Sequence, residues 1–400
     1  MAEDYAGGVS NHVEGSVRAT PVATRWWKSF GPAWLVMIAD VDAASILTGL
    51  ASGVAYQYDL IWFLFILVIP LFVVQEAAGR IGAVTGKGLG EIVRERWSRR
   101  TAIAIVIPVA LADIASYVAE YAAIAIALGI FGVPLLISIP LAFLLHIGLV
   151  ARGKYVWVER ILLAVSGFFI IAVVSALTMR GLLPYTPIYF SATPSFTFLL
   201  AANAGAVVMP FMLFYQSSAT AEKKGTSVRW VRIETLVGAF ASELLMVAYL
   251  MLGAGMPAHT DLYTTSGLSS ALATVGGWFL PYAFSLGLLA AAFVALVVIS
   301  LGSAWGVAEA LGIPRNRAFW IYALESVPAV ILPFLYPRLL ALVLILMVLL
   351  VFILIGPGIL AGLIVQDKRI MGEMASSGVW KVAYWSSIAC IVFCGVVAMV

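Results

Sequence analysis

Charged residues are scarce in this sequence. Asp, Glu, Lys and Arg make up 11% of its 400 residues, whereas a soluble domain averages about 25% because its surface contacts water. Hydrophobic residues make up 63%, and the mean hydropathy is +1.06. A soluble globular protein is therefore excluded. At about 35 residues per helix and loop, the length predicts an all-α polytopic membrane protein with about 11 transmembrane helices.

Cysteine and histidine are also rare. The sequence has two cysteines, Cys390 and Cys394, and three histidines, His12, His146 and His259. None of them is placed in the sequence so as to form a zinc site. Metalloprotease, nucleophile-elbow and P-loop motifs are absent as well. We therefore expect no enzyme and no bound cofactor.

The positive charge is small and local. The net charge is +3, and the basic residues lie in short hydrophilic gaps, so we expect no nucleic-acid partner. Residues 1–28 hold no apolar run and are expected to form a disordered cytosolic tail, whereas residues 29–400 form one transmembrane domain. The predicted spans are 30–52, 59–79, 101–130, 133–150, 156–179, 196–219, 231–255, 277–310, 317–336, 338–365 and 380–399.

The distribution of Lys and Arg predicts the orientation. If the N-terminus is cytoplasmic, 21 of these residues fall on the inner side and only two, Arg180 and Arg338, fall on the outer side. The positive-inside rule therefore places the N-terminus in the cytoplasm. An odd number of spans then leaves the C-terminus outside a multi-pass protein of the cell membrane.

Two of the predicted spans contain residues that are unusual in a lipid-facing helix. The first span carries Asp40 and Asp42 near its middle, and the sixth carries Gly205, Met209 and Pro210. A mid-span proline leaves a carbonyl group without its helical partner. Two aspartates two residues apart point about 200° apart on a regular helix, so both reach polar surroundings only if the backbone unwinds. We therefore predict that spans 1 and 6 are discontinuous.

The separation of these two spans predicts an internal repeat. Spans 1–5 and 6–10 enter the membrane from opposite sides, as inverted repeats do, and span 11 is an addition. Interrupted helices at matching positions of two halves indicate the binding site of a transporter. For span 6 taken alone, an ordinary proline kink in a packed helix bundle stays open as an alternative.

The two interruptions offer ligands for a cation if they face each other. Asp42 supplies a carboxylate, Ser45 a hydroxyl, the backbone near Ala39 and Ala206 carbonyl oxygens, and Met209 a thioether. A carboxylate with carbonyl oxygens suits Mg²⁺, Ca²⁺ or Mn²⁺, whereas a thioether favours softer transition metals. The sequence thus predicts a divalent-cation site.

These residues match a known family. The segments FGPA at 30–33, Asp42–Ser45 at the position of a DPGN motif, and Met209–Phe211 at the position of an MPH motif carry the resemblance, together with GKGLGEIVRERW at 86–97 and AEY at 119–121. Over about residues 29–399 the chain resembles the NRAMP divalent-metal transporters. This resemblance implies a LeuT-type fold, with inverted repeats of spans 1–5 and 6–10 and discontinuous spans 1 and 6.

The departures from the family pattern concern its metal and proton chemistry. Ser45 stands in place of the asparagine of DPGN, Phe211 replaces the histidine of MPH, and Tyr117 replaces an acid of span 3, whereas Glu120 is retained. This pattern is most similar to the NRAMP-related magnesium transporters. That branch implies transport of Mg²⁺ and Mn²⁺ without obligatory proton coupling. The retained Met209 argues for Mn²⁺ or Fe²⁺ instead.

Further polar residues are secondary candidates. Asp40 offers a second carboxylate that can hold a hydrated ion, and Gln216 can orient a bound water or ligand. Asp113 and Glu120 lie one heptad apart and can line one polar face of span 3.

The leading hypothesis is a secondary transporter that imports Mg²⁺ and Mn²⁺ by alternating access, without obligatory proton coupling. One alternative is a proton-coupled importer of Mn²⁺ or Fe²⁺, and another is a Na⁺-coupled solute transporter on a LeuT-type scaffold. Asp42 argues against the latter, because it repels a substrate carboxylate. A channel also uses acidic residues along a polar path. The expected partners are divalent metal ions and the lipid bilayer, and the expected state is a monomer.

Overall fold

The computed structural model of the protein describes residues 31–151, 186–223, 225–257, 260–314 and 317–399, and all of the regular elements in these ranges are helices. Its helices, in chain order, are α1 (Pro32–Asp40), α2 (Ala43–Tyr56), α3 (Ile61–Thr85), α4 (Leu89–Arg96), α5 (Arg99–Ile130), α6 (Leu135–Ala151), α9 (Pro194–Val207), α10 (Pro210–Glu222), α11 (Val228–Ala254), α12 (Thr265–Gly276), α13 (Leu280–Leu311), α14 (Ala318–Glu325), α15 (Val327–Leu335), α16 (Leu339–Ile353), α17 (Ile355–Gln366), α18 (Lys368–Met371), the 3₁₀ helix η4 (Gly372–Met374) and α19 (Val379–Val397).

Most of the predicted spans correspond to these helices. Within the described residues, eight helical stretches are long and apolar enough to cross a membrane, α1 and α2 together form a ninth, and α6 is a shorter apolar helix. Their ends lie within six residues of the predicted ends. The predicted span at 156–179 and the predicted tail of residues 1–28 lie outside the described residues. The count of eleven spans therefore stays a prediction.

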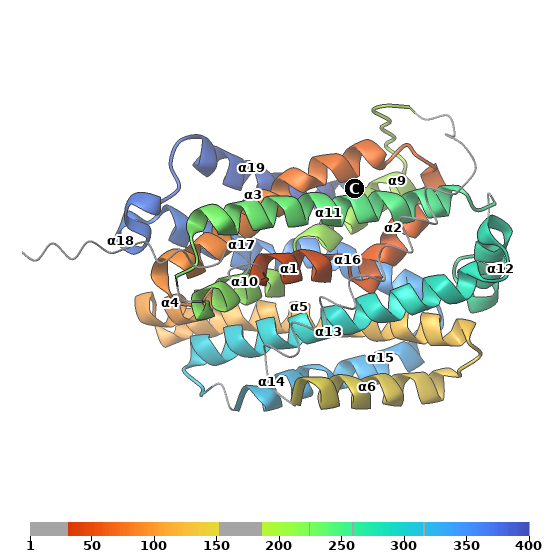
Figure 1. The fold of residues 1–400 in the computed structure, drawn as a ribbon, viewed down its shortest axis with the longest axis horizontal. Coiled ribbons are helices and arrows are strands. Elements are labelled where there is room, and N and C mark those ends of the chain that lie inside the picture. Colours follow the sequence, from red (N-terminus) through yellow and green to blue (C-terminus); the bar gives the residue numbers. More distant parts are fainter. Residues whose placement is uncertain (1–30, 152–185, 224, 258–259, 315–316, 400) are drawn as a thin grey trace, which may run out of the picture.

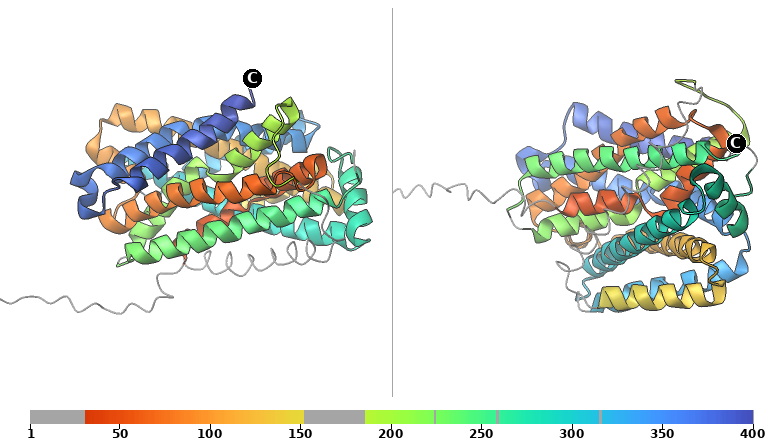
Figure 2. Two further views of the ribbon diagram at one scale, coloured as in Figure 1. Left: turned by 90° about the horizontal axis from the view of Figure 1, so that it is seen from above. Right: turned by 45° about the vertical axis from the view of Figure 1, so that its right-hand side comes forward.

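The helices are stacked in layers (Figures 1 and 2). α3 and α11 cover one side of the molecule, α1, α10 and α16 lie in the middle, and α5 and α13 follow as the next layer. α6, α14 and α15 form the opposite side. The contacts agree with this order, because α10 packs on both α3 and α13, and α2 packs on α11 and α5.

The outer helices present large apolar side chains to their surroundings. Residues of this kind that are exposed on α5, α6 and α15 are Ile107, Leu111, Leu136, Leu144 and Leu335. In water, a continuous apolar surface of this kind is unfavourable, whereas in a bilayer it faces hydrocarbon chains. The interrupted helices α1, α2, α9 and α10 are instead almost entirely buried. Their breaks therefore lie in the protein interior, away from lipid.

Glycines bring α2 and α9, each one half of an interrupted helix, close to their neighbours. A Cβ atom at Gly53 in α2 would overlap the Leu250 carbonyl oxygen in α11, and one at Gly253 in α11 would overlap the Leu50 carbonyl oxygen in α2. Gly205 in α9 lies equally close to the Met347 carbonyl oxygen in α16. Backbones approach this closely only where no side chain intervenes. α2 is therefore fixed against α11, and α9 against α16.

We expect Gly253→Ala to destabilise the protein, because its Cβ overlaps the Leu50 carbonyl oxygen and forces α2 away from α11. Overpacking of this kind costs about 1–3 kcal/mol, which lowers the melting temperature measured by scanning fluorimetry on the detergent-purified protein. Gly356→Ala in α17 is the matched control, since a Cβ at Gly356 meets no atom within 4 Å. Equal melting temperatures for the two variants would contradict this packing.

Candidate functional site

The two helix interruptions meet in the interior. α1 ends at Asp40 and α2 begins at Ala43 with a bend of 44°. α9 ends at Val207 and α10 begins at Pro210. The Ser45 hydroxyl donates a hydrogen bond to the Ala206 carbonyl oxygen at 3.5 Å. This bond joins the two interrupted segments, so two of the predicted ligand residues are in direct contact.

The ends of the half-helices determine the electrostatics of this junction. The last four carbonyl groups of a helix lack an intrahelical partner and carry partial negative charge. Ala39 lies in the last turn of α1 and Ala206 in the last turn of α9. Their carbonyl groups are therefore among those that lack an intrahelical partner. The C-terminal ends of α1 and α9 therefore supply oxygen atoms that attract a cation.

Two carboxyl groups lie at the beginning of α2. Asp42 caps this helix, and its Oδ1 atom accepts a hydrogen bond from the Ser45 backbone N–H at 2.5 Å. Glu120 of α5 accepts hydrogen bonds from the N–H groups of Ala43 and Ala44 at 3.3 and 3.4 Å. The carboxyl groups of Asp42 and Glu120 also interact with each other. Glu120 thus connects α5 to the unwound segment.

The predicted ligand residues are shielded from solvent. Ala39, Asp42, Ser45, Ala206 and Met209 are each at most 2% exposed. A bare carboxylate at this depth is costly unless it is paired, hydrogen-bonded or bound to a cation. The carboxyl group of Asp42, the hydroxyl of Ser45 and the carbonyl of Ala206 together form an oxygen-rich environment for a hard cation.

The two residues around Pro210 are buried in the same region. The Met209 N–H lies 3.4 Å from the Met212 sulfur, and both Met209 and Phe211 are fully buried. Gly302 of α13 packs against the Phe211 carbonyl oxygen. The position at which the family has a histidine is therefore enclosed between α10 and α13.

Three secondary candidates contact residues other than the predicted metal ligands. The Asp40 carboxylate accepts a hydrogen bond from Ser242 of α11 at 2.6 Å, so it faces α11. The Gln216 amide donates to the Thr235 hydroxyl at 3.1 Å, also in α11. Asp113 lies close to two polar groups, Ser303 of α13 and Glu325 of α14, which share a hydrogen bond of 2.5 Å. Asp113 and Glu120 thus have separate environments, although they lie one heptad apart on α5.

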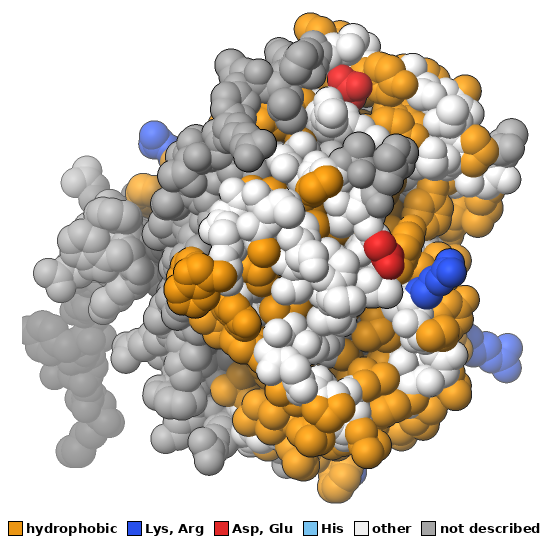
Figure 3. All heavy atoms as spheres, turned by 90° about the vertical axis from the view of Figure 1, so that its right-hand side faces the viewer, with side chains coloured by type: hydrophobic (Ala, Val, Ile, Leu, Met, Phe, Trp, Pro, Cys, Tyr) orange, Lys and Arg blue, Asp and Glu red, His pale blue; other side chains and the backbone are white. Residues whose placement is uncertain are grey.

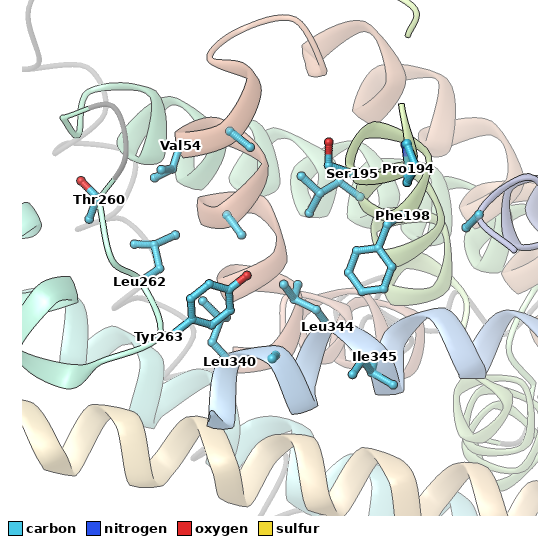
Figure 4. Close-up of a pocket in the computed structure, with 15 residues that line it drawn as sticks. Val54, Pro194, Ser195, Phe198, Thr260, Leu262, Tyr263, Leu340, Leu344 and Ile345 are labelled. Carbon is cyan, nitrogen blue, oxygen red and sulfur yellow. The ribbon is translucent and has the colours of Figure 1, made fainter. Parts of the chain in front are cut away.

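A cavity opens from the end of the molecule that carries α12 (Figure 4). Its volume is about 640 Å³, and its lining comes from α2, α9, α16 and the segment before α12. Phe198 and Tyr263 point into it. Between this cavity and the junction, the Asn203 amide of α9 donates a 2.8 Å hydrogen bond to the Ser52 hydroxyl of α2. This bond therefore links α2 and α9 on the cavity side of the junction.

The beginning of α1, at the other side of the junction, is bonded to α11. The Glu234 carboxylate of α11, only 3% exposed, accepts hydrogen bonds from the N–H groups of Gly31 and Trp34, at 2.5 and 3.0 Å. An acidic side chain at a helix N-terminus is favoured by the helix dipole. Glu234 therefore holds the beginning of α1 against α11.

A comparison with protein families identifies the chain. A family model described as natural resistance-associated macrophage protein-like (Nramp) matches residues 33–400. The chain belongs to the Nramp family. The family predicted from the sequence is therefore confirmed, whereas membership of its magnesium-transporting branch stays a prediction.

Curated relatives of this Nramp protein are only distantly similar. It is 26% identical over 274 residues to the divalent metal cation transporter MntH of Pediococcus pentosaceus, a match that covers 63% of this chain and 61% of that protein. It is 28% identical over 300 residues to MntH of Mycobacterium tuberculosis, covering 68% and 67%. For several relatives, the match spans only about half of their length, as for MntH of Xylella fastidiosa at 52%.

Solved structures share the fold of this Nramp protein. The manganese transporter of Eremococcus coleocola, crystallised with an aromatic bis-isothiourea compound, aligns with a TM-score of 0.79 at 19% identity, covering 94% of this chain and 86% of that one. Mhp1, a nucleobase-cation-symport-1 family transporter, aligns with a TM-score of 0.51 at 16% identity, covering 92% of both chains. The predicted fold class is confirmed, and the internal repeat stays a prediction.

Some residues that shape the junction are not indicated by the sequence motifs. The cap that Glu234 provides, the Ser52–Asn203 hydrogen bond and the pairing of Asp40 with Ser242 join helices that are far apart in the chain. Helical periodicity shows which residues share a face, but it does not show which helix that face contacts. An acidic residue in a hydrophobic span, as at Asp40, is a sequence feature that can mark such contacts.

We expect Glu234→Gln to loosen the inner end of α1, because the substitution removes a charge that the helix N-terminus favours by about 0.3–2 kcal/mol. The measurement is the rate at which a maleimide modifies a cysteine introduced at the buried Ala33, with Cys390 and Cys394 replaced by serine. This rate should rise about two- to thirtyfold. Glu95→Gln on the exposed face of α4 is the control, and equal rates in both variants would show that Glu234 does not hold α1.

Proposed function

We propose that this protein is a secondary transporter that imports divalent metal cations by alternating access. The observation that carries the proposal is the junction of the two interrupted helices. There, the carboxylate of Asp42, the hydroxyl of Ser45 and the carbonyl of Ala206 come together in the interior, away from lipid and solvent. Interrupted helices whose carbonyl ends meet an acidic residue form a cation site in the middle of a membrane.

The names of the relatives support this proposal. The MntH relatives are named divalent metal cation transporters, and the structural neighbour from Eremococcus coleocola is named a manganese transporter. No enzymatic activity is part of these names. A Na⁺-coupled solute transporter is less well supported, because Asp42 would repel a substrate carboxylate at the position where such transporters bind it.

The two closures of the junction fit alternating access. The Ser52–Asn203 hydrogen bond joins the outer halves α2 and α9, and Glu234 joins the inner half α1 to α11. In this proposal, opening the outer link connects the site to the cavity in Figure 4, and releasing α1 opens the inner side. Each ion crosses while at least one of the two closures is in place.

The distribution of charge supports a cytoplasmic N-terminus. Among the described residues, basic side chains gather at the end that carries α4 and α18, as in Arg96 and Arg369. The opposite end, shown in Figure 3, has only scattered charged groups. The C-terminal Ala398 lines the cavity at that opposite end. The positive-inside rule then places α1 at the cytoplasmic side and the C-terminus outside.

We propose Mg²⁺ and Mn²⁺ as the transported ions. Mg²⁺ dehydrates reluctantly and prefers a roomy, oxygen-rich site. Ser45 is shorter than the asparagine of the family motif and leaves more space beside Asp42, and a thioether such as Met209 can lie beside a hydrated ion without bonding to it. A Mn²⁺ or Fe²⁺ importer is the second candidate, which Met209 and the name of the manganese transporter favour.

The absence of proton coupling is part of this proposal. Phe211 does not titrate, and Tyr117 forms a hydrogen bond with Ser300 at 2.9 Å instead of supplying an acid. His146 bonds to Tyr121 and Ser300 at 2.9 and 2.7 Å, on the α13 side of α5. The membrane potential suffices to drive uptake, because each charge gains about 2.3 kcal/mol per 100 mV.

We expect Asp42→Asn to reduce Mn²⁺ uptake into proteoliposomes to background, because the substitution removes the charged ligand of the junction. Replacing even an outer partner of a metal ligand typically lowers affinity about 10–100-fold, so a larger loss is expected here. Asp367→Asn, the same change at an exposed carboxylate paired with Arg96, is the control and should transport normally. Uptake by Asp42→Asn at the unaltered rate would refute the proposed site.

The selectivity and coupling are tested in the same vesicles. Mg²⁺ at millimolar concentration is expected to compete with Mn²⁺ uptake, and the internal pH is expected to stay constant while Mn²⁺ enters. The physical reasons are the oxygen-rich junction and the lack of a titrating side chain at Phe211. Failure of Mg²⁺ to compete, together with a stoichiometric fall in internal pH, would instead establish the proton-coupled transition-metal importer.

A further inference from the structure

A second pair of acidic groups lies on the other side of the chain break. Asp42 faces α5 and Glu120, whereas Asp40 faces α11, where its Oδ2 atom accepts the 2.6 Å hydrogen bond from Ser242. The next residue of α11 is Glu243, so a second carboxyl group directly follows the residue that contacts Asp40. The unwound segment therefore separates two acidic environments.

The oxygens of this second pair lack partners in the described part of the chain. Asp40 is 2% exposed and Glu243 is fully buried. Within the described residues, Asp40 Oδ1 and both carboxylate oxygens of Glu243 make no hydrogen bond, and no ion pair joins either residue to a basic side chain. Two buried carboxyl groups without donors are costly and need a neutralising partner.

The surrounding packing admits only a small partner. One turn towards the inner end, Gly238 of α11 packs directly against Met37 of α1. Towards the outer end, a Cβ at Gly49 of α2 would lie 3.2 Å from the Met246 side chain. The acidic pair therefore lies between two close contacts of α11, one with α1 and one with α2. These contacts exclude a bulky ligand, so a partner of the acidic pair is no larger than a single ion.

We propose that Asp40, Ser242 and Glu243 form a second divalent-cation site on the inner side of the junction. Two carboxylates balance the charge of one divalent ion, and the Ser242 hydroxyl adds a third oxygen donor. No sulfur atom belongs to this donor set, so the site takes hard cations such as Mg²⁺, Ca²⁺ or Mn²⁺. This inference rests on the proposed function in one respect: the ion at the second site is of the same class, a divalent metal cation, as the ions that the protein is proposed to transport.

The position of this site gives it a role in release. Asp40 is the last residue of α1, the half-helix that Glu234 holds at the inner closure. An ion that leaves Asp42 towards the inner end meets Asp40 next. Two divalent ions so close together repel each other strongly in a low-dielectric interior, so occupation of one site weakens binding at the other and favours departure.

The test measures Mn²⁺ binding to the full-length protein by equilibrium dialysis. Asp42→Asn is expected to retain one Mn²⁺ site that Mg²⁺ and Ca²⁺ displace about as well as each other, and that Cd²⁺ displaces poorly. Adding Glu243→Gln should lower this remaining affinity at least about tenfold, by analogy with the loss of metal-ligand partners elsewhere. Adding Glu325→Gln, a buried acid that bonds to Ser303, is the matched control and should leave it unchanged.

The outcomes separate this inference from the proposed function. If Asp42→Asn binds no Mn²⁺ although the unaltered protein does, the second site does not exist and the acidic pair is neutralised by protons, while the transport proposal stands. If Asp42→Asn still transports, the transport proposal fails instead. Should Glu243→Gln not fold, Ser242→Ala in the Asp42→Asn background takes its place. Unchanged Mn²⁺ affinity in that variant would overturn the inference.

Discussion

The need to satisfy backbone polar groups away from water determines the architecture of this protein. A hydrocarbon environment tolerates an unwound helix only where other protein groups replace the missing hydrogen bonds. Here the Ser45 hydroxyl donates a hydrogen bond to the Ala206 carbonyl oxygen, and the Glu120 carboxylate accepts hydrogen bonds from the N–H groups at the start of α2. The interrupted helices consequently lie at the centre of the bundle. The groups that stabilise the breaks are the same groups that suit a cation.

Close packing around the breaks divides the molecule into parts that can move separately. Glycine contacts bring the backbone of α2 against that of α11 and the backbone of α9 against that of α16. The contacts of α1 with α11 instead involve side chains, because Met37 packs on Gly238 and the Glu234 carboxylate accepts hydrogen bonds from the beginning of α1. Breaking hydrogen bonds to a helix N-terminus costs less free energy than breaking close apolar packing, because water can replace the hydrogen bonds. The inner half of span 1 is therefore better suited to opening than the outer half.

The sequence predicted the helical membrane class and the two interruptions, because aspartates and a mid-span proline conflict with a continuous lipid-facing helix. The partners of these residues were not predictable in the same way. Asp40 was predicted to offer a second carboxylate for a hydrated ion, and its hydrogen bond to Ser242 of α11 is visible only in the structure. Asp113 was predicted to line one polar face of span 3 with Glu120, and its neighbour Glu325 likewise becomes apparent only in the structure. Periodicity fixes directions around one helix, whereas these contacts depend on how helices distant in sequence pack together.

The central claim is that a divalent cation binds between the two helix interruptions. Anomalous diffraction from crystals of the Mn²⁺-loaded protein tests it most directly, since the signal locates the ion independently of transport. The account predicts a peak between the Asp42 carboxylate and the Ala206 carbonyl oxygen, with the Ser45–Ala206 hydrogen bond rearranged. Crystals of protein that transports Mn²⁺ but shows no peak at that junction would contradict the account.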